Sequence, residues 1–373
     1  MKINMLRVLP FFLLLLNVYC LPVQAAYSPP VAAESAVLMD VGSGQVLYQK
    51  NAFQRRPPAS TTKILTALLA LEGGDLGQVV TISKTAASTG ESSIYLQAGE
   101  NLTLEELIYG ALLKSGNDSC VAIAEQIAGT EANFVQLMNE KAKQMGAMDS
   151  HFVNCNGLPA EGHYSTAYDL AKLTCYALQN PVFNTVVSTR EKVIRGPGWQ
   201  RHLQNTNQLL DTYTFADGVK TGTTNAAGPC LVASATRDNR RLVSVVLHSA
   251  NRYGDSKSLL EYGFNNFSNN KVLTAGQVIG DIPVCDGFSP AVQAVSKGDL
   301  TVVIPNGRTD LIEKKIYLVD GLTAPVKKEQ KIGRVDLYMD KVYIASTDLI
   351  ASGSIERLPA YRILWRKFYQ NIG

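Results

Sequence analysis

The chain has 373 residues, of which 46% are hydrophobic and 18% charged, and its formal net charge is +3. This length accommodates two domains, and the composition is that of a globular protein. It excludes long disordered stretches and argues against a nucleic-acid-binding surface, so no nucleic-acid partner is expected.

Residues 1–26 have the pattern of a secretory signal peptide. Lys2 and Arg7 stand before an apolar run over residues 8–18, and Val23-Gln24-Ala25 supplies a cleavage signal. An uncleaved anchor helix is the alternative, but the run is interrupted and shorter than the roughly 20 residues that a membrane span needs. We therefore expect cleavage and export, which remove two positive charges and reduce the net charge from +3 to +1.

Residues 27–271 carry strand signals at both ends and helix signals between them. The stretch 35–51 alternates apolar and polar residues around Gly42-Ser43-Gly44, which predicts a hairpin. Helical periodicity follows in five segments between residues 60 and 179, and after Lys220 two apolar runs flank a turn at 237–240, followed by a helix. This order predicts an α/β (α+β) domain with a mixed sheet packed by helices and assembled from both ends of the segment.

The composition changes after about residue 271. Residues 272–355 contain short apolar segments separated by turn residues, with no helical pattern, and predict a small all-β second domain.

Residues 356–373 predict a terminal amphipathic helix. One face of this helix is apolar and aromatic and suits the interface of a membrane, where its aromatic rings would lie at the headgroup level. That face consists of Tyr361, Leu364, Trp365, Phe368, Tyr369 and Ile372. The basic residues of the helix, Arg362, Arg366 and Lys367, lie off that face. The alternative is a terminal helix docked on its own protein, and the segment is too short and too charged to span a bilayer.

The stretch PPASTTKILTALLALEGG places a serine and a lysine at the start of an apolar helix. Ser60 and Lys63 are three residues apart, so they share one face of the helix, and the amine can reach the hydroxyl. Burial would lower the pKa of the lysine and make it a base for the serine. Alone, the pair is more typical of a helix cap beside a lysine whose amine reaches solvent.

Two more short motifs change this interpretation. Ser115-Gly116-Asn117 falls at a break between two helical runs, and Lys220-Thr221-Gly222 opens the first strand of the later pair. Individually these are typical of a capping turn and of a strand edge. In this order, they match the signature Ser-x-x-Lys, Ser-x-Asn, Lys-Thr-Gly of the penicillin-recognising serine enzymes.

From the hairpin to the terminal helix the sequence resembles the low-molecular-mass penicillin-binding proteins, which are serine-type D-alanyl-D-alanine carboxypeptidases. The resemblance includes PASTTK, LLKSGND, NCNGLPAEGHYSTAYDLA and DGVKTGTTNAAGPCLVASA. It implies that Ser60 is the acylated nucleophile and Lys63 its proton acceptor. Ser115 would relay a proton to the leaving D-alanine, and Asn117 would bind the substrate backbone and support Lys63.

The resemblance also implies how the substrate is held. Lys220 would place a cation near Ser115 and the substrate carboxylate, and Thr221 would position that carboxylate. Gly222 would let the strand lie close to the peptide, and the backbone N–H groups of Ser60 and Thr223 would form the oxyanion hole. Such a site suits an extended peptide that ends in a carboxylate.

The implied substrate is the peptidoglycan pentapeptide ending in D-Ala-D-Ala, with β-lactam antibiotics as covalent inhibitors. The implied location is the outer face of the bacterial cytoplasmic membrane. No cofactor is implied. No metal is expected, because the four histidines are scattered and the cysteines form no CxxC pair.

Two alternatives remain at this stage. A class A β-lactamase shares the three motifs, but PAEGHYST around Glu161 lacks the Glu-x-x-x-Asn arrangement of that family. A catalytically slow peptidoglycan-binding protein would keep the site as a binding surface. Labelled penicillin and a pentapeptide substrate separate these possibilities from the carboxypeptidase.

Overall fold

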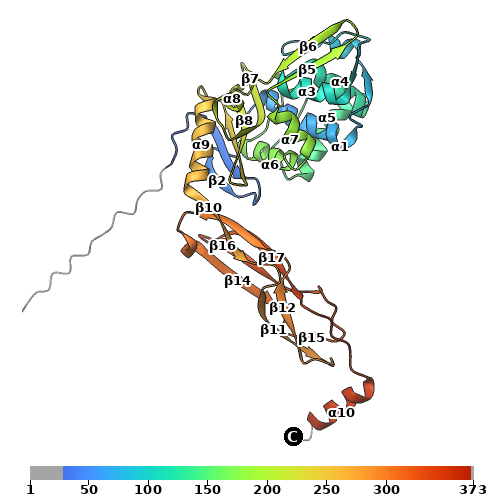
Figure 1. Ribbon diagram of the computed structural model, residues 1–373, viewed down its shortest axis with the longest axis vertical. Helices are drawn as coiled ribbons and strands as arrows, with labels where there is room; N and C mark the ends of the chain where they lie inside the picture. The colour runs from blue at the N-terminus through green and yellow to red at the C-terminus, as the bar shows by residue number, and fades with distance from the viewer. Residues whose placement is uncertain (1–27, 371–373) are drawn as a thin grey trace, which may run out of the picture.

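The structure is a computed structural model that describes residues 28–370 (Figure 1). The predicted signal peptide lies outside the described residues. Figure 1 shows a helix-rich N-terminal domain, an elongated β-domain beneath it and a C-terminal helix at the far end of the β-domain.

A five-stranded sheet forms one layer of the first domain. Its strand order is β2 (Val46–Lys50), β1 (Ser35–Asp40), β9 (Arg240–Leu247), β8 (Gly228–Arg237) and β7 (Ala216–Thr224). The sheet is built from both ends of the domain, and β1 and β2 form the predicted hairpin. The predicted fold class is confirmed, although all four ladders within this sheet are antiparallel rather than mixed.

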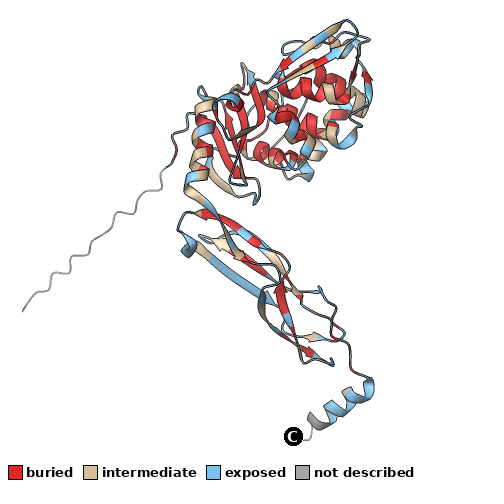
Figure 2. Ribbon diagram, viewed as in Figure 1, coloured by how far each residue is buried: buried red, intermediate tan, exposed pale blue. Residues whose placement is uncertain are grey.

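Both faces of this sheet are covered, which explains why β1 is buried at every position. Side chains alternate between faces along a strand. Ala36 and Leu38 pack in the cluster with Leu259 and Leu260 of α9 (Arg252–Asn266), whereas Val37 and Met39 join the larger core on the other face. Figure 2 shows these buried strands between exposed outer surfaces of the helices.

The helices of this domain cover both faces of the sheet, with α9 on one face and α1 (Lys63–Gly73) and the helices packed around it on the other. They are α1 (Lys63–Gly73), α2 (Lys84–Ala87), α3 (Leu104–Leu113), α4 (Asn117–Ala128), α5 (Glu131–Gln144), α6 (Ala167–Ala177), α7 (Pro181–Ser188), α8 (Leu209–Thr212) and α9 (Arg252–Asn266). One turn of 3-10 helix, η1 (Ala59–Thr62), precedes α1. Two small ladders complete the domain: β3 (Val79–Thr81) with β4 (Asn101–Thr103), and β5 (Glu191–Gly196) with β6 (Trp199–Gln204).

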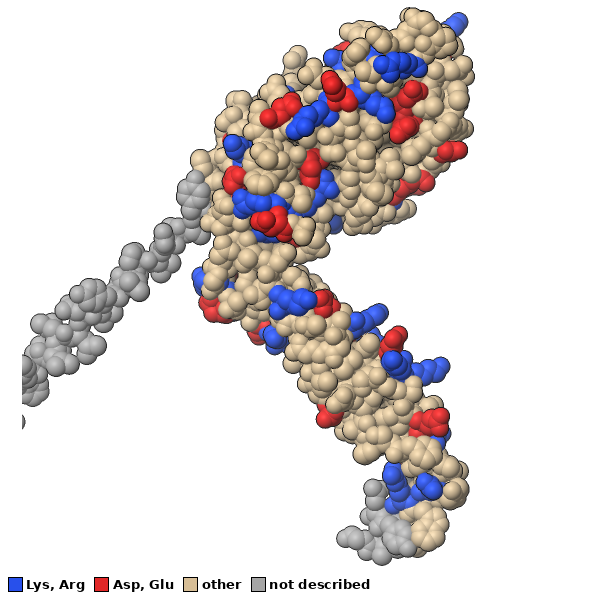
Figure 3. All heavy atoms as spheres, in the orientation of Figure 1, with Lys and Arg blue, Asp and Glu red and all other residues tan. Residues whose placement is uncertain are grey.

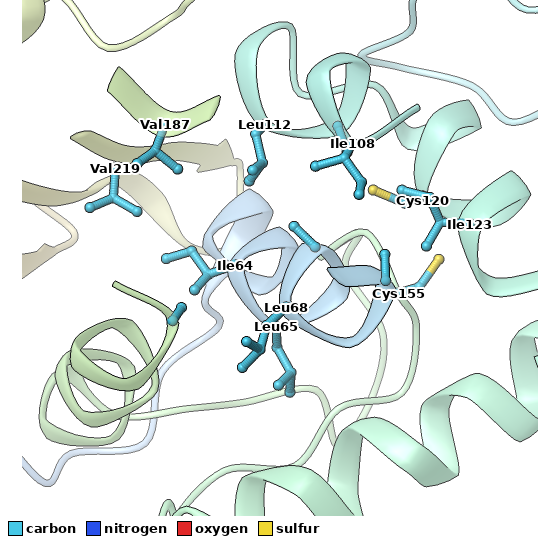
Figure 4. Close-up of a cluster of buried hydrophobic side chains, with 14 of the residues drawn as sticks. Ile64, Leu65, Leu68, Ile108, Leu112, Cys120, Ile123, Cys155, Val187 and Val219 are labelled. Atoms are coloured by element: carbon cyan, nitrogen blue, oxygen red, sulfur yellow. The ribbon is translucent and has the colours of Figure 1, made fainter. Parts of the chain in front are cut away.

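Helix α1 is the centre of the larger core. Ile64, Leu65 and Leu68 are each about 1% exposed, and Figure 4 shows side chains of α3, α4, α7 and β7 around them. Burying an aliphatic side chain of this size contributes roughly 1.5–3 kcal/mol. The apolar run that predicted a buried helix thus fixes the start of α1 firmly in space.

The second domain is all β, as predicted. A six-stranded sheet has the order β14 (Ile312–Leu318), β16 (Lys331–Met339), β17 (Val342–Ala351), β12 (Ala291–Ser296), β11 (Val278–Cys285) and β15 (Leu322–Thr323). A separate ladder joins β10 (Phe267–Leu273) to β13 (Leu300–Pro305), and a short 3-10 turn, η2 (Thr309–Leu311), precedes β14. Strand β10 begins directly after α9, so the chain enters the β-domain at Phe267.

The junction between the domains contains specific polar contacts. The amide of Gln45 donates to the carbonyl of Val303 at 3.1 Å and accepts from its N–H at 2.7 Å. Arg240 pairs with Asp40 at 2.9 Å and donates to the carbonyl of Phe267 at 2.7 Å. Both domains therefore contribute to one hydrogen-bonded contact.

Helix α10 (Ala360–Gln370) ends the described chain. Within residues 28–370, no helix is both long enough and apolar enough to cross a membrane. Charged side chains of both signs are spread over both domains, and basic side chains lie near this helix (Figure 3).

Candidate active site

Ser60 and Lys63 lie side by side where η1 meets α1. The Lys63 amine is 2.9 Å from the hydroxyl of Ser60. Ser60 is partly exposed, whereas Lys63 is fully buried. Ala59, directly before the serine, has a left-handed backbone with φ 48°, a strained conformation for a residue with a Cβ. The serine hydroxyl is thus reachable from outside while its lysine partner is shielded from water.

The other contacts of Lys63 suit an uncharged amine. Its nitrogen is 2.8 Å from the side-chain oxygen of Asn117 and 2.6 Å from the carbonyl of Asn156, both neutral acceptors. Burial lowers the pKa of Lys63. A neutral amine has two N–H groups and one lone pair, so donation to these two acceptors leaves the lone pair for the Ser60 proton.

Ser115 and Asn117 occupy the break between α3 and α4. Ser115 is 7% exposed and has a left-handed backbone with φ 65°. Asn117 is the first residue of α4, and its side-chain nitrogen donates to the carbonyl of Gly90 at 2.9 Å. One of its two amide N–H groups is therefore used within the protein and one is left for a ligand.

The Lys-Thr-Gly motif lies within β7, at the edge of the sheet, rather than at the start of the strand. Lys220 is 1% exposed, and its amine donates to the carbonyl of Thr221 at 3.0 Å. Burial holds the pKa of Lys220 well below its ordinary value, and the Lys63 amine lowers it further whenever that amine is protonated. A carboxylate brought to this nitrogen would favour its ammonium form.

Gly222 is the point at which β7 approaches η1. A Cβ at position 222 would lie 3.0 Å from the backbone nitrogen of Ser60 and 3.2 Å from the carbonyl of Pro58. Only glycine permits this approach without displacement of one segment. The edge of β7 and Ser60 therefore face one shared site.

Arg252 is a functional candidate for which the sequence allows two interpretations, because it follows the second strand of the later pair and could add charge for the carboxylate or be a solvated turn arginine. The sequence alone favours the turn, but Arg252 is the first residue of α9, so that prediction is wrong. Its guanidinium donates to the hydroxyl of Thr223 at 2.8 Å and to the carbonyl of Gly222 at 3.1 Å. The sequence offers no signal for this contact, since α9 and β7 meet only through the fold.

The loop NCNG is a second contribution that pattern reasoning missed. It supplies the Asn156 carbonyl to Lys63 through its backbone, so the side chain gives no clue. Gly157, with φ 87°, packs so closely on Ala59 that a Cβ there would lie 1.9 Å from the Ala59 carbonyl oxygen. The loop therefore packs against the residue before Ser60 and accepts a hydrogen bond from Lys63, so it helps to hold both side chains in place.

Metal ligands are a separate question. Among the residues that the structure describes, no group of three or more His, Cys, Asp or Glu side chains is arranged to hold a metal ion.

Comparison with known proteins identifies the family of this constellation. Residues 22–251 match the family of D-alanyl-D-alanine carboxypeptidases, and residues 267–357 match the C-terminal domain of penicillin-binding protein 5. The chain is 34% identical to D-alanyl-D-alanine carboxypeptidase DacF of Bacillus subtilis over 352 residues, covering 90% of each chain. It is 36% identical to DacA of Escherichia coli over 337 residues, covering 86% of this chain and 83% of that protein.

Solved structures of similar proteins support the same family assignment. Penicillin-binding protein 5 of Haemophilus influenzae is similar with a TM-score of 0.78 at 33% identity, covering 89% of this chain and 99% of the other. A protein described as a peptidoglycan synthesis regulatory factor (PBP3) from Streptococcus pneumoniae has a TM-score of 0.73 at 26% identity, with coverage of 88% and 100%.

The site and fold thus define a penicillin-recognising serine enzyme with an α/β catalytic domain and an all-β second domain. The chain belongs to the family of serine-type D-alanyl-D-alanine carboxypeptidases, the low-molecular-mass penicillin-binding proteins. This confirms the family and enzyme class predicted from the three motifs.

Proposed function

We propose that the protein removes the terminal D-alanine from peptidoglycan pentapeptides through an acyl-enzyme on Ser60. The observation that carries this proposal is the contact of 2.9 Å between the Ser60 hydroxyl and the buried Lys63 amine, whose other two partners are neutral carbonyl groups. A serine becomes a nucleophile when a neighbouring base accepts its proton.

The acylation step uses the groups already described. Ser60 Oγ bonds to the carbonyl carbon of the penultimate D-alanine while its proton passes to Lys63. The carbon–nitrogen bond to the terminal D-alanine then breaks, and Lys63 passes the proton through Ser115 to the departing nitrogen. Water next attacks the ester carbonyl and gives one proton to Lys63. The ester bond breaks, the shortened peptide leaves with the water oxygen in its new carboxyl group, and Lys63 hands the water proton to Ser60 Oγ.

The oxyanion of each tetrahedral intermediate lies between the backbone N–H groups of Ser60 and Thr223. The close approach of β7 at Gly222 supports this assignment. One donor of this kind is worth about 3 to 4 kcal/mol of transition-state stabilisation. The geometry between β7 and η1 therefore matters nearly as much as the nucleophile.

The carboxylate of the terminal D-alanine is assigned to the end of the site formed by Lys220, Thr221 and Arg252. The extended peptide lies along the edge of β7, where the substrate backbone adds to the sheet. Arg252 contributes a permanent positive charge and a planar set of donors that suits a carboxylate. β-Lactams carry a carboxylate and a reactive amide in a similar arrangement, so they acylate Ser60 as well.

The organisation of the chain follows from this role. Residues 1–26 are proposed to direct export and to be removed. The catalytic domain is proposed to end with α9 at Asn266, five residues before the boundary expected from the sequence, and the second domain to cover residues 267–355. Residues 356–373 are proposed to be an anchor on the outer face of the cytoplasmic membrane. Exposure of Tyr361, Leu364 and Trp365, each more than 60% accessible, supports the anchor. Ile372, part of the expected apolar face, lies outside the described residues.

The second domain is proposed to be a spacer. In Figure 1 it separates the catalytic domain from α10, so anchoring of this helix would hold the active site away from the membrane. Deletion of residues 357–373 should move the protein from the membrane fraction to the supernatant with undiminished peptidase activity. An unchanged membrane fraction would argue against the anchor.

The activity is tested with labelled penicillin and with a pentapeptide ending in D-Ala-D-Ala. The wild-type protein should form a covalent adduct at Ser60 and release D-alanine, and Ser60→Ala should do neither. An adduct without release would favour a peptidoglycan-binding role, and rapid hydrolysis of penicillin would favour a β-lactamase. Absence of both adduct and release would refute the proposal.

A further inference from the structure

The loop between β6 and α8 connects α3, α9 and β7 through a single residue, Thr206. Its N–H donates to the carbonyl of Leu113 at the end of α3, at 3.1 Å. Its carbonyl accepts from the hydroxyl of Tyr253 on α9 at 2.9 Å. Its own hydroxyl lies 2.6 Å from that of Thr221 in β7.

The two asparagines that flank Thr206 hold this loop rigidly. The amide of Asn205 donates to the carbonyls of Val187 and Thr189, at 3.3 and 3.0 Å. The amide of Asn207 donates to the carbonyl of Gly218 in β7 at 2.8 Å. Because both neighbours are tied to the surrounding backbone, the position of the Thr206 hydroxyl relative to Thr221 is fixed by the fold.

The numbers of protons and lone pairs on the two hydroxyls decide which of them donates in this contact when a carboxylate is bound. A threonine hydroxyl has one proton and two lone pairs, so in the pair only one residue donates to the other. A carboxylate can only accept, so Thr221 can bind it only with its own proton. If Thr206 donates to Thr221, the Thr221 proton is free to point at the carboxylate, and the two bonds strengthen each other.

We propose that Thr206 is a positioning residue for recognition of the substrate carboxylate, donating to the Thr221 hydroxyl so that Thr221 donates to the terminal carboxylate. The inference rests on the proposed carboxypeptidase function and adds a residue that lies outside all three sequence motifs. Thr206 is exposed beside Thr221, which is 6% exposed, so a bound carboxylate would cover the pair.

The test compares Thr206→Val with the wild-type protein on two peptides that differ only at the C-terminus, one ending in D-Ala-D-Ala and the other in D-Ala-D-alaninamide. Valine keeps the shape and removes the hydroxyl. For the acid, kcat/KM should fall about tenfold, mostly through KM, because one hydrogen bond of the charge-binding chain is lost. For the neutral amide, kcat/KM should stay at the low wild-type value, since it has no carboxylate to bind.

Two further variants separate positioning from a general structural role. Thr206→Ser keeps the donor and should restore kcat/KM for the acid to within about twofold of the wild type, well inside the effect of one hydrogen bond. In a Thr221→Val background, Thr206→Val should cause no further loss, because its effect passes through the Thr221 hydroxyl. Thermal unfolding checks the fold, and Thr206→Ala replaces the valine variant if that one unfolds early.

The outcomes are distinct. Equal losses on acid and amide, no loss on the acid, or an additive loss in the Thr221→Val background would overturn the positioning role while leaving the carboxypeptidase assignment intact. A wild-type protein that forms no penicillin adduct and releases no D-alanine would overturn the proposed function and this inference together.

Discussion

The two domains treat buried charge in opposite ways. The catalytic domain encloses two lysines, Lys63 at 0% and Lys220 at 1% exposure. In the second domain the buried cluster is aliphatic, and its one buried carboxylate, on Asp336, lies 3.2 Å from the guanidinium of Arg334, which reaches solvent. Burial of an ammonium without a carboxylate partner costs stability. The catalytic domain therefore loses some stability at its proposed active site.

This difference explains why the burial of side chains has different consequences in the two domains. In the second domain, burial serves packing alone, so changes there should alter stability and leave chemistry unaffected. In the catalytic domain, the helix that forms the centre of the core (Figure 4) also carries Lys63, the proposed base. Packing and chemistry cannot be separated there.

The largest expected effect comes from a substitution that keeps position 63 positively charged at every pH. Lys63→Arg keeps a positive charge but removes the titratable base, so penicillin acylation should fall by about 10²- to 10⁴-fold, the usual contribution of a positioned base. In the wild type the acylation rate should rise with pH, because deprotonation produces the reactive amine, whose pKa is lowered by burial. The arginine variant should lack this rise in stopped-flow measurements between mildly acidic and alkaline pH.

An arginine variant that acylates at nearly the wild-type rate would contradict the base assignment. Lys84→Arg is the matched control. Lys84 opens the short surface helix α2 and lies outside the described contacts of the site. Its rate and pH profile should be those of the wild type.

The next effect sharpens the contrast through a matched pair of core substitutions. Leu337→Ala in the second domain and Leu68→Ala in α1 each remove a fully buried side chain, and each should cost about 2–5 kcal/mol. Leu337→Ala should lower the unfolding temperature of the second domain and leave kcat unchanged. Leu68→Ala should lower both stability and kcat, because α1 holds Lys63 in place.

Calorimetry followed by the peptidase assay measures both quantities on the same samples. If Leu337→Ala reduced kcat as much as Leu68→Ala, the second domain would be coupled to the active site, for example through the Gln45 contact to Val303. Packing in the second domain would then no longer be independent of the chemistry in the catalytic domain.

A third prediction concerns the stability of the protein at acidic pH. His163 accepts from the N–H of Val153 at 3.1 Å, so its other ring nitrogen carries the proton and donates to the Thr62 hydroxyl at 3.0 Å. Burial lowers the pKa of His163 to about 4. The unfolded chain takes up this proton near pH 6.5, before the folded protein does, so the free energy of unfolding should fall as the pH drops from about 6.5 to about 4.

The loss attributable to His163 should reach about 2 to 3 kcal/mol near pH 4. His163→Gln can form both hydrogen bonds without titrating and should remove that part of the acid sensitivity. His202→Gln, an exposed residue of β6, is the control. Since all four histidines precede the second domain, its unfolding should be insensitive to either change. Identical pH profiles for His163→Gln and the wild type would exclude this role for the histidine.

Much of this organisation could be predicted from the sequence because its causes are local. The hairpin of β1 and β2, the buried α1 and the break before Asn117 each follow from periodicity or turn residues. The meeting of Ser60 with Lys63 follows from helical spacing. The contacts that depend on tertiary packing could not be predicted. Arg252 reaches β7 from α9, and Thr206 reaches it from a loop, and neither has a recognisable pattern.

The smallest effect tests the approach of β7 to η1, where catalytic and structural demands meet. A Cβ in Gly222→Ala would sit 3.0 Å from the Ser60 nitrogen, so one segment must shift by a few tenths of an ångström. Acylation should then fall about tenfold, because the oxyanion donors on the two segments move apart. Gly298→Ala in the second domain, where a Cβ meets nothing within 4 Å, should leave the rate unchanged. If Gly222→Ala acylated as fast as Gly298→Ala, the oxyanion hole could not depend on the spacing between Ser60 and β7.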